Sequence, residues 1–192
     1  GLGVVVRSEG CAQFGVLVTD DERIARLARQ YANNGLPSEA VRYWETKPGL
    51  NFQPSNVHAA LAVAQLERID ELVAARRHTH AGWRKRLGGL PGLALQMSYG
   101  EPSWWLTGVL IGREFTEMLP QDLGSALLER GIQTRPGFYG IHQLPHCRGA
   151  AVVPCPMTER LLRSLLVLPS GAGVTEEDQD RVVAEMFDIV GK

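Results

Sequence analysis

The longest continuous pattern of hydrophobic and polar positions covers residues 49–77. A short polar turn comes first, and Ser55 then offers a hydroxyl that can accept a hydrogen bond from a first-turn amide, as a helix N-cap does. After it, apolar residues recur at spacings of four, three and four, which places them on one face of a single long helix. Before residue 66 the helix is apolar nearly all round, so we expect its first half to be buried between layers. The members of the apolar face are Ala62, Leu66, Ile69 and Val73.

The first part of the chain predicts two strands followed by a helix. Residues 3–6 and 15–18 are short apolar runs rich in valine, which favours strands. Thr19, followed by Glu22 three residues later, forms the pattern of a capping box at the start of a helix. That helix is expected to stop near Gly35, because glycine readily adopts the left-handed conformation that ends helices.

The second part of the chain begins after Gly88-Gly89 and alternates short strands with helices. This alternation predicts a small α/β layer. We therefore expect a domain of residues 1–88, which contains the long helix, and a smaller C-terminal α/β domain of residues 89–192. The expected strands cover 93–97, 104–111, 132–134 and 166–168, and the expected helices cover 120–131, 157–165 and 175–189.

Composition narrows the classes of function. The 192 residues are 44% hydrophobic and 21% charged, with a net charge of −1, which is ordinary for a globular protein. No basic excess indicates a nucleic-acid partner or an anionic membrane surface, and no apolar run reaches the roughly 18 residues of a membrane span. The three cysteines follow no disulfide pattern, so we expect reduced thiols in a cytoplasmic protein.

Two motifs in the central stretch resemble a known family. The turn at 49–56 reads GLNFQPSN and fits the pattern G-x-N-[YF]-x-x-[ST]-[ND], and the helix after it carries Ala59-Ala60 and Ala64-Gln65-Leu66. Both are similar to the DegT/DnrJ/EryC1/StrS sugar aminotransferases. The resemblance implies an α/β fold that is the C-terminal part of a fold-type I enzyme, like aspartate aminotransferase, and it implies pyridoxal 5'-phosphate as cofactor.

Asn51 is the cofactor-binding residue that the resemblance implies. In the family the asparagine of this turn reaches across a subunit interface and binds the pyridoxal-phosphate phosphate of the neighbouring chain. A side-chain donor near a helix N-terminus suits an anion. The alternative is an asparagine that only forms the turn. The chain also departs from the family at Gln53, where an arginine is usual, and at Pro54.

A second motif lies at residues 131–145, which read GIQTRPGFYGIHQLP. It is similar to a segment of the perosamine-synthase-like branch of the family, and it implies that Arg135, Tyr139 and His142 lie on a loop over a nucleotide-sugar substrate. A guanidinium binds phosphate in a bidentate manner. The alternatives are a structural ion pair for Arg135 and a packed, hydrogen-bonded loop histidine for His142.

Tyr43 and Trp44 lie in a stretch with loop composition, residues 36–50. Family members carry an aromatic-rich loop over the substrate here, so the resemblance implies substrate binding. Aromatic side chains that merely cover the edge of the core are an equal alternative. No metal site is expected, because the histidines and cysteines between 142 and 155 fit no common zinc spacing.

The catalytic lysine of the family has no counterpart in this chain. Residues 15–22, GVLVTDDE, match the family's strand-to-helix join, but residues 12–14, Ala-Gln-Phe, replace its glycine motif. Counting back from there without a gap places Arg7 near the position of the Schiff-base lysine. Arginine stays protonated and is a poor nucleophile. The three lysines of the chain are Lys47, Lys85 and Lys192.

These features favour a subunit or half of a pyridoxal-phosphate-dependent aminotransferase that acts on a small keto-sugar. A homologous or complementary partner chain would supply the Schiff-base lysine, and the protein would be an obligate oligomer that shares the cofactor across a heterodimer. The alternative is a catalytically inactive paralogue that stabilises or regulates an active aminotransferase. A lysine-free dehydratase-like chemistry on the same cofactor ranks last.

Overall fold

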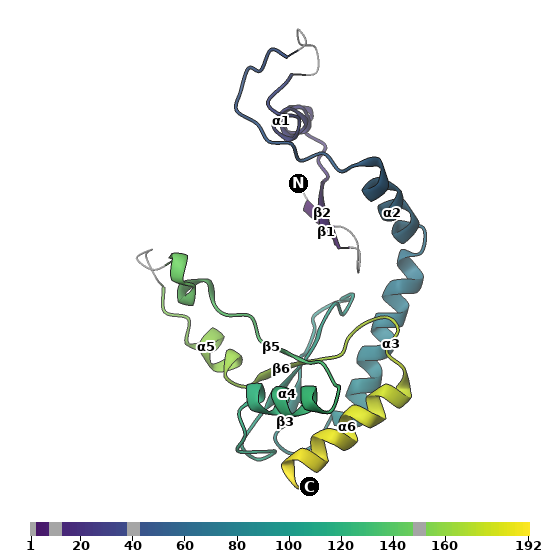
Figure 1. The fold of residues 1–192 in the computed structure, drawn as a ribbon, viewed down its shortest axis with the longest axis vertical. Coiled ribbons are helices and arrows are strands. Elements are labelled where there is room, and N and C mark those ends of the chain that lie inside the picture. Colours follow the sequence, from purple (N-terminus) through teal and green to yellow (C-terminus); the bar gives the residue numbers. More distant parts are fainter. Residues whose placement is uncertain (1–2, 8–12, 38–42, 148–152) are drawn as a thin grey trace. The chain divides into compact units, whose positions relative to one another are not determined.

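The computed structural model describes the backbone of residues 3–7, 13–37, 43–147 and 153–192, and within these ranges the side chains from Leu17 onward. The chain forms two compact units, which divide between Ile69 and Asp70 (Figure 1). The predicted domains, residues 1–88 and residues 89–192, stay a prediction.

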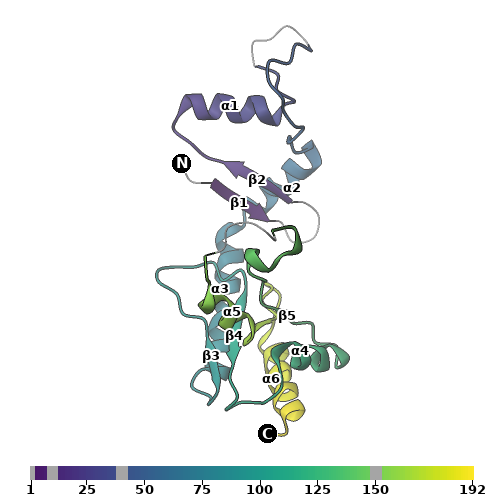
Figure 2. The ribbon, with the colours of Figure 1, turned by 90° about the vertical axis from the view of Figure 1, so that its left-hand side faces the viewer.

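The first unit begins with the two predicted strands. Strand β1, Gly3–Arg7, pairs antiparallel with β2, Gln13–Leu17 (Figure 2). The replaced glycine motif falls partly outside the described residues, because Ala12 is not described, and for Arg7 only the backbone is described. The predicted strands are therefore confirmed at the level of the backbone.

Helix α1, Glu22–Ala32, begins two residues later than the predicted capping box requires. Its N-cap is Asp21, whose carboxylate accepts hydrogen bonds from the amides of Arg23 at 2.8 Å and Ile24 at 3.1 Å. The Thr19 hydroxyl instead accepts from the Asp21 amide at 3.1 Å. The prediction of Thr19 as N-cap was wrong, because the Asp21 carboxylate reaches the orphan first-turn amides itself.

The end of α1 is tightly packed against the loop that returns to it. Gly35 has a φ of +80°, and a Cβ atom at this position would lie 1.7 Å from the carbonyl oxygen of Lys47. Gly35 also donates its amide proton to the carbonyl of Gln30 at 2.8 Å. The predicted stop is confirmed, and only glycine combines this conformation with this approach.

The single long helix predicted from residue 56 onward is two helices. Helix α2, Asn56–Leu66, starts at the predicted N-cap Ser55, and helix α3 covers Ile69–Leu87. At the break, the amide of Arg68 bonds to the carbonyl of Gln65 at 3.3 Å, three residues earlier rather than four. Periodicity runs through this step unchanged and could not reveal it.

The predicted burial of the apolar face along α2 and the start of α3 is also largely wrong. Ala62 is buried, but Leu66 and Ile69 are 50% and 44% exposed, and Val57 and Val63 are exposed as well. The apolar pattern of α2 is therefore not satisfied by contacts within the described residues of the first unit.

The second unit is a four-stranded antiparallel sheet with helices. The strand order is β3-β4-β6-β5, and Arg135 in β5 pairs with Val167 in β6. The strand predicted at residues 132–134 covers residues 135–136 instead, and these two residues pair with β6. The elements are β3 Leu93–Leu95, β4 Thr107–Ile111, α4 Pro120–Glu129, β5 Arg135–Pro136, the 3-10 turns Ile141–Gln143 and Pro145–Cys147, α5 Pro156–Leu162, β6 Leu165–Leu168 and α6 Glu176–Val190.

The hydrophobic core of the second unit joins the sheet to α3, α4 and α6. Each large side chain buried there contributes about 1.5–3 kcal/mol of transfer free energy. Trp83 of α3 is completely buried and still donates its indole N–H to the carbonyl of Pro169 at 3.0 Å. Fully buried members include Trp83, Val109, Leu123, Leu127 and Met186.

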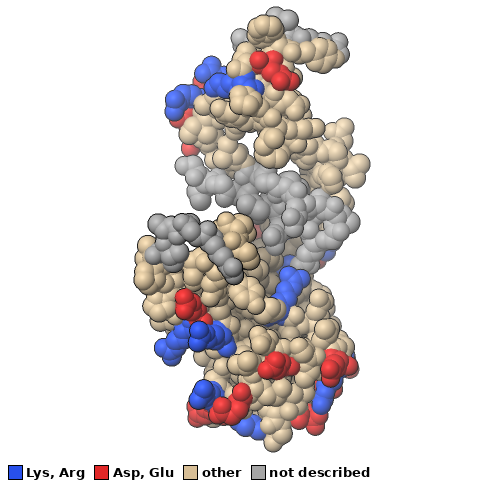
Figure 3. Space-filling view, turned by 60° about the vertical axis from the view of Figure 1, so that its left-hand side comes forward, with Lys and Arg blue, Asp and Glu red and all other residues tan. Residues whose placement is uncertain are grey.

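Charged side chains of both signs lie next to one another on the surface of the second unit (Figure 3). One ion pair joins α3 to α6: Arg86, with a side chain 10% exposed, donates to the Asp180 carboxylate at 2.6 Å. Among the described residues, no helix has the length and apolarity that a bilayer span requires.

Candidate functional site

The turn that carries Asn51 is fixed to the end of α1 by backbone hydrogen bonds. The amide of Leu50 donates to the carbonyl of Tyr31 at 2.8 Å, and the amide of Phe52 donates to the carbonyl of Ala32 at 2.9 Å. Asn51 itself forms an isolated antiparallel bridge with Asn33. The backbone position of Asn51 is therefore set by α1.

The side chain of Asn51 is exposed, in contrast to its fixed backbone. Within the described chain its amide group forms no hydrogen bond. The α2 N-cap follows four residues later, where Ser55 accepts from the amide of His58 at 3.4 Å. Asn51 thus offers an unused donor and acceptor on a rigid turn, close in sequence to the start of a helix.

Tyr43 and Trp44 lie in the loop between α1 and this turn. Their exposed fractions are 78% and 66%, and Tyr43 has a φ of +67°. Their contact with a substrate stays a prediction. The alternative, that they cover the edge of the core, also stays open.

Gln30 anchors this loop, and the sequence analysis did not identify it. Its side chain is 9% exposed, and its amide nitrogen donates to the carbonyl of Gly35 at 2.9 Å and to the hydroxyl of Thr46 at 2.7 Å. A glutamine on a helix gives no sequence signal for such a role, because its partners are set by the return of the loop.

Tyr139 lies at a cavity of about 300 Å³ in the second unit. The exposed fraction of its side chain is 70%. The walls of the cavity are partly apolar, from Leu162 and Leu165, and partly charged, from Glu159 and Arg163. Arg135 is exposed on β5, and its guanidinium forms no ion pair with a described carboxylate.

His142 is directed against α5 rather than into solvent. Its Nε2 lies 3.3 Å from Oε1 of Glu159, and its side chain is 19% exposed. A Cβ atom on Gly140 would lie 2.6 Å from the His142 ring, so the loop packs closely on it. This geometry fits the alternative given for His142, a packed and hydrogen-bonded loop histidine. A substrate contact by His142 stays a prediction.

The six predicted residues fall into two groups. The first unit contains Asn51, Tyr43 and Trp44, and the second contains Arg135, Tyr139 and His142. Among the described residues, no group of three or more histidine, cysteine or acidic side chains is arranged to hold a metal ion.

A buried histidine in the second unit was also missed by the sequence analysis. His80 is 3% exposed, its Nδ1 lies 3.2 Å from the Thr107 hydroxyl, and its ring stacks on Trp104 with the centroids 3.4 Å apart. Its Nε2 has no hydrogen-bond partner. Burial, and then the charge of Arg84, lower the pKa of His80.

Sequence comparison relates the chain to aminotransferases. A model of the DegT/DnrJ/EryC1/StrS aminotransferase family matches residues 9–187. GDP-perosamine synthase of Caulobacter vibrioides is 30% identical over 196 aligned positions, which cover 99% of this chain and 50% of that protein. GDP-perosamine synthase of Vibrio cholerae is 31% identical, with 85% and 44% covered. The chain therefore spans about half the length of the curated relatives it matches.

Solved structures show the same partial match. DesI, solved in the presence of its TDP-sugar product, superposes with a TM-score of 0.80 at 28% identity, over 91% of this chain and 45% of that one. Helicobacter pylori PseC, an aminotransferase involved in the biosynthesis of pseudoaminic acid, gives a TM-score of 0.80 at 17% identity, over 90% and 47%. The likeness to PseC shows the fold alone.

Proposed function

Because the chain belongs to the DegT/DnrJ/EryC1/StrS aminotransferase family, we propose that it forms one part of a pyridoxal-phosphate-dependent site that transfers an amino group to a keto-sugar. Its fold is that of the C-terminal part of the fold-type I sugar aminotransferases. Members of the family are oligomeric enzymes that act on small sugar substrates. When bound, the cofactor supplies the electron sink for amino-group transfer, and the protein supplies binding and orientation.

Asn51 contributes a hydrogen bond to the cofactor phosphate across a subunit interface. The observation that supports this role is its exposed side chain with an unused amide on a turn fixed to α1. A preset donor loses little conformational freedom on binding an anion in another chain. The residues present thus fit a phosphate contact, although they do not enclose a cofactor.

The Schiff-base lysine comes from a homologous or complementary partner chain. Arg7 lies near its position in the motif, and the lysines of the chain, Lys47, Lys85 and Lys192, all come at least 40 residues later in the sequence. Lys192 donates to the carbonyl of Glu114 at 2.9 Å, near the end of α6. The proposal therefore includes a heterodimer, or another obligate oligomer, located in the cytoplasm.

Each unit contributes, separately, loop residues that contact a sugar substrate. In the second unit, the Arg135 guanidinium contacts the substrate phosphates, and Tyr139 lies against the sugar. In the first unit, Tyr43 and Trp44 cover the substrate. The exposed fractions of Trp44 and Tyr139, 66% and 70%, support the assignment, since much of each ring is accessible to a ligand.

Replacement of Asn51 tests the proposal directly. The chain is mixed with its candidate partner, and the affinity of the mixture for pyridoxal phosphate is measured by its absorbance. A hydrogen bond to a charged group contributes about 1.5–3 kcal/mol, so Asn51→Ala is expected to weaken cofactor binding by at least about tenfold. Asn56→Ala, which removes an exposed amide from the first turn of α2, is expected to leave the affinity unchanged.

The alternative function is a catalytically inactive paralogue that stabilises an active aminotransferase. Gln53, in place of the family's arginine, favours it. In that case the chain would raise the thermal stability or activity of its partner, and Asn51→Ala would leave the cofactor affinity of the mixture unchanged. That combination of results would replace the first proposal with the second.

A further inference from the structure

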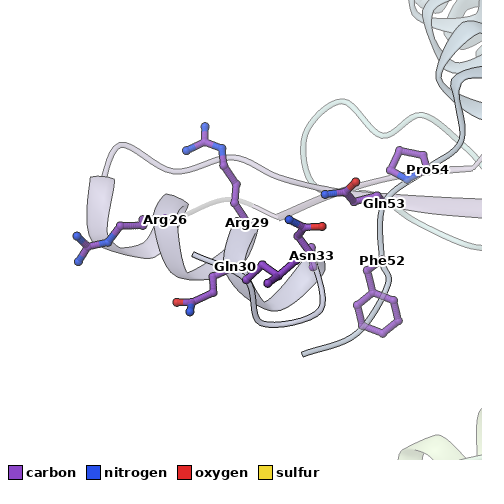
Figure 4. A pocket seen from close by; sticks show the side chains of 9 residues that line it. Arg26, Arg29, Gln30, Asn33, Phe52, Gln53 and Pro54 are labelled. Atoms are coloured by element: carbon purple, nitrogen blue, oxygen red, sulfur yellow. The ribbon is translucent and has the colours of Figure 1, made fainter. Parts of the chain in front are cut away.

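A cavity of about 460 Å³ lies beside the C-terminal half of α1 in the first unit. Its volume is within the range of small-molecule sites. Part of the lining comes from successive turns of α1 and part from the segment after Asn51, so the two walls are joined by the same backbone bonds that fix that turn. Lining residues include Arg26, Arg29, Asn33, Phe52, Gln53 and Pro54 (Figure 4).

The cavity is bordered by two unused positive charges. Arg26 and Arg29 are three residues apart on α1, and in Figure 4 their side chains extend from the helix in different directions. Both side chains are exposed, and neither forms an ion pair with a described carboxylate. The described part of the chain therefore leaves both charges available to a ligand.

The negative end of the α1 dipole does not oppose an anion here. Carbonyl oxygens at the C-terminus of a helix repel negative charge when they have no partner. In this structure the amide of Asn33 bonds to the carbonyls of Arg29 and Gln30, the amide of Leu50 bonds to Tyr31, and the amide of Phe52 bonds to Ala32. These carbonyls are occupied, and they do not line the cavity as free acceptors.

Neutral donors and an apolar wall complete the lining. The side-chain amides of Asn33 and Gln53 lie on opposite walls, and in Figure 4 the Gln53 side chain extends toward the helix. Phe52, with an exposed fraction of 71%, and Pro54 add apolar surface. Guanidinium groups with amide donors recognise phosphate oxygens, while the apolar wall suits the organic part of the same ligand.

We propose that this cavity binds a small phosphorylated molecule through its phosphate or diphosphate group. Two guanidiniums from separate turns favour an anion with at least two negative charges and several oxygens over a single carboxylate. The inference goes beyond the proposed aminotransferase function, because binding requires neither the Schiff-base lysine nor a partner chain.

Calorimetric titration of the full chain with pyrophosphate at low ionic strength tests the site. Arg29→Gln and Arg26→Gln are each expected to weaken binding by about tenfold, since each removes a charge-assisted hydrogen bond. The matched control is Arg23→Gln, which removes the same charge from an exposed position of α1 outside the cavity. It is expected to change the affinity less than about twofold, because screened surface charges contribute little.

Two results would overturn the inference. One is the absence of pyrophosphate binding by the unaltered chain. The other is an equal loss for Arg23→Gln and Arg29→Gln, which would mean a general charge effect. Circular dichroism of the three variants checks that helix content is preserved. The result is independent of Asn51 and of the partner, so either proposal can fail without the other.

Discussion

At the scale of single residues, burial separates two histidines that are only two positions apart. The side chain of His78 is 72% exposed, whereas His80 is 3% exposed, stacks on Trp104 and leaves Nε2 without a partner. A buried imidazole is disfavoured in its charged form, and the nearby charge of Arg84 adds to this, so the pKa of His80 is lowered. His80 is therefore a neutral structural group that holds α3 against β4 through Thr107.

The lowered pKa of His80 predicts acid sensitivity. The unfolded chain takes up a proton at about pH 6.5, the ordinary value for histidine, while the folded chain does so at lower pH. The contribution of His80 to the free energy of unfolding is therefore expected to be constant above about pH 6.5. It is expected to fall as the pH drops below that value. Urea unfolding about one pH unit above and below this value measures the slope.

His80→Gln is expected to reduce that slope, because glutamine keeps a hydrogen-bonding group for Thr107 but does not titrate. His78→Gln, at the exposed position, is expected to keep it. An unchanged slope in His80→Gln would show that other groups cause the acid sensitivity.

At the scale of elements, the sequence predicted a helix N-cap correctly at one site and wrongly at another. Thr175 caps α6 as expected, with its hydroxyl accepting from the amide of Asp178 at 3.1 Å. Thr19 failed as a cap because Asp21 competes within the same polar run, and sequence alone cannot rank them. The break between α2 and α3 was hidden because the apolar spacing continues through it.

In the candidate site, too, the sequence predicted what lies within one continuous segment and missed what depends on packing between segments. The motifs located the turn at 49–56 and the loop at 131–145, since these are continuous in sequence. The partner of His142 could not be predicted, because Glu159 lies 17 residues away on another helix and meets it only through packing. The same holds for Gln30, whose contacts depend on the path of a loop.

The contact between α3 and α6 predicts a large effect for one arginine. Arg86 is nearly enclosed and donates to Asp180 at 2.6 Å and to the side-chain oxygen of Gln179 at 3.0 Å. Asp180 is 69% exposed and stays solvated without Arg86, but the side-chain oxygen of Gln179, which is 2% exposed, would lose its charged donor. Arg86→Ala is expected to lower the free energy of unfolding by about 2 kcal/mol, measured by urea denaturation.

Arg113→Ala is the matched control, because the pair of Arg113 with Glu117 is 91% and 81% exposed at 3.9 Å. Exposed pairs contribute about 0–1 kcal/mol. Equal losses for the two variants would contradict the structural role of the Arg86 cluster.

At the scale of the whole molecule, the two units differ in how their apolar residues are covered. The hydrophobic core cluster lies entirely in residues 83–190 of the second unit. In the first unit, Ala62 is the buried apolar residue among the described side chains, while Val57, Val63 and Leu66 of α2 are at least half exposed. Because packing supplies most of the stability of a short helix, the first unit needs further apolar contacts that its own described residues do not provide.

This difference predicts two levels of protection from hydrogen exchange. Amides of β4 and α6 are expected to exchange only through global unfolding, because they belong to the packed core, whereas amides of α1 and α2 exchange through local opening. If a partner chain completes the site, its addition should slow exchange in α1 and α2 and leave β4 unchanged. Exchange followed by mass spectrometry, with and without the partner, measures this. Protection of α1 and α2 equal to that of β4 in the chain alone would contradict the prediction, and it would remove the physical reason for expecting a partner on the first unit.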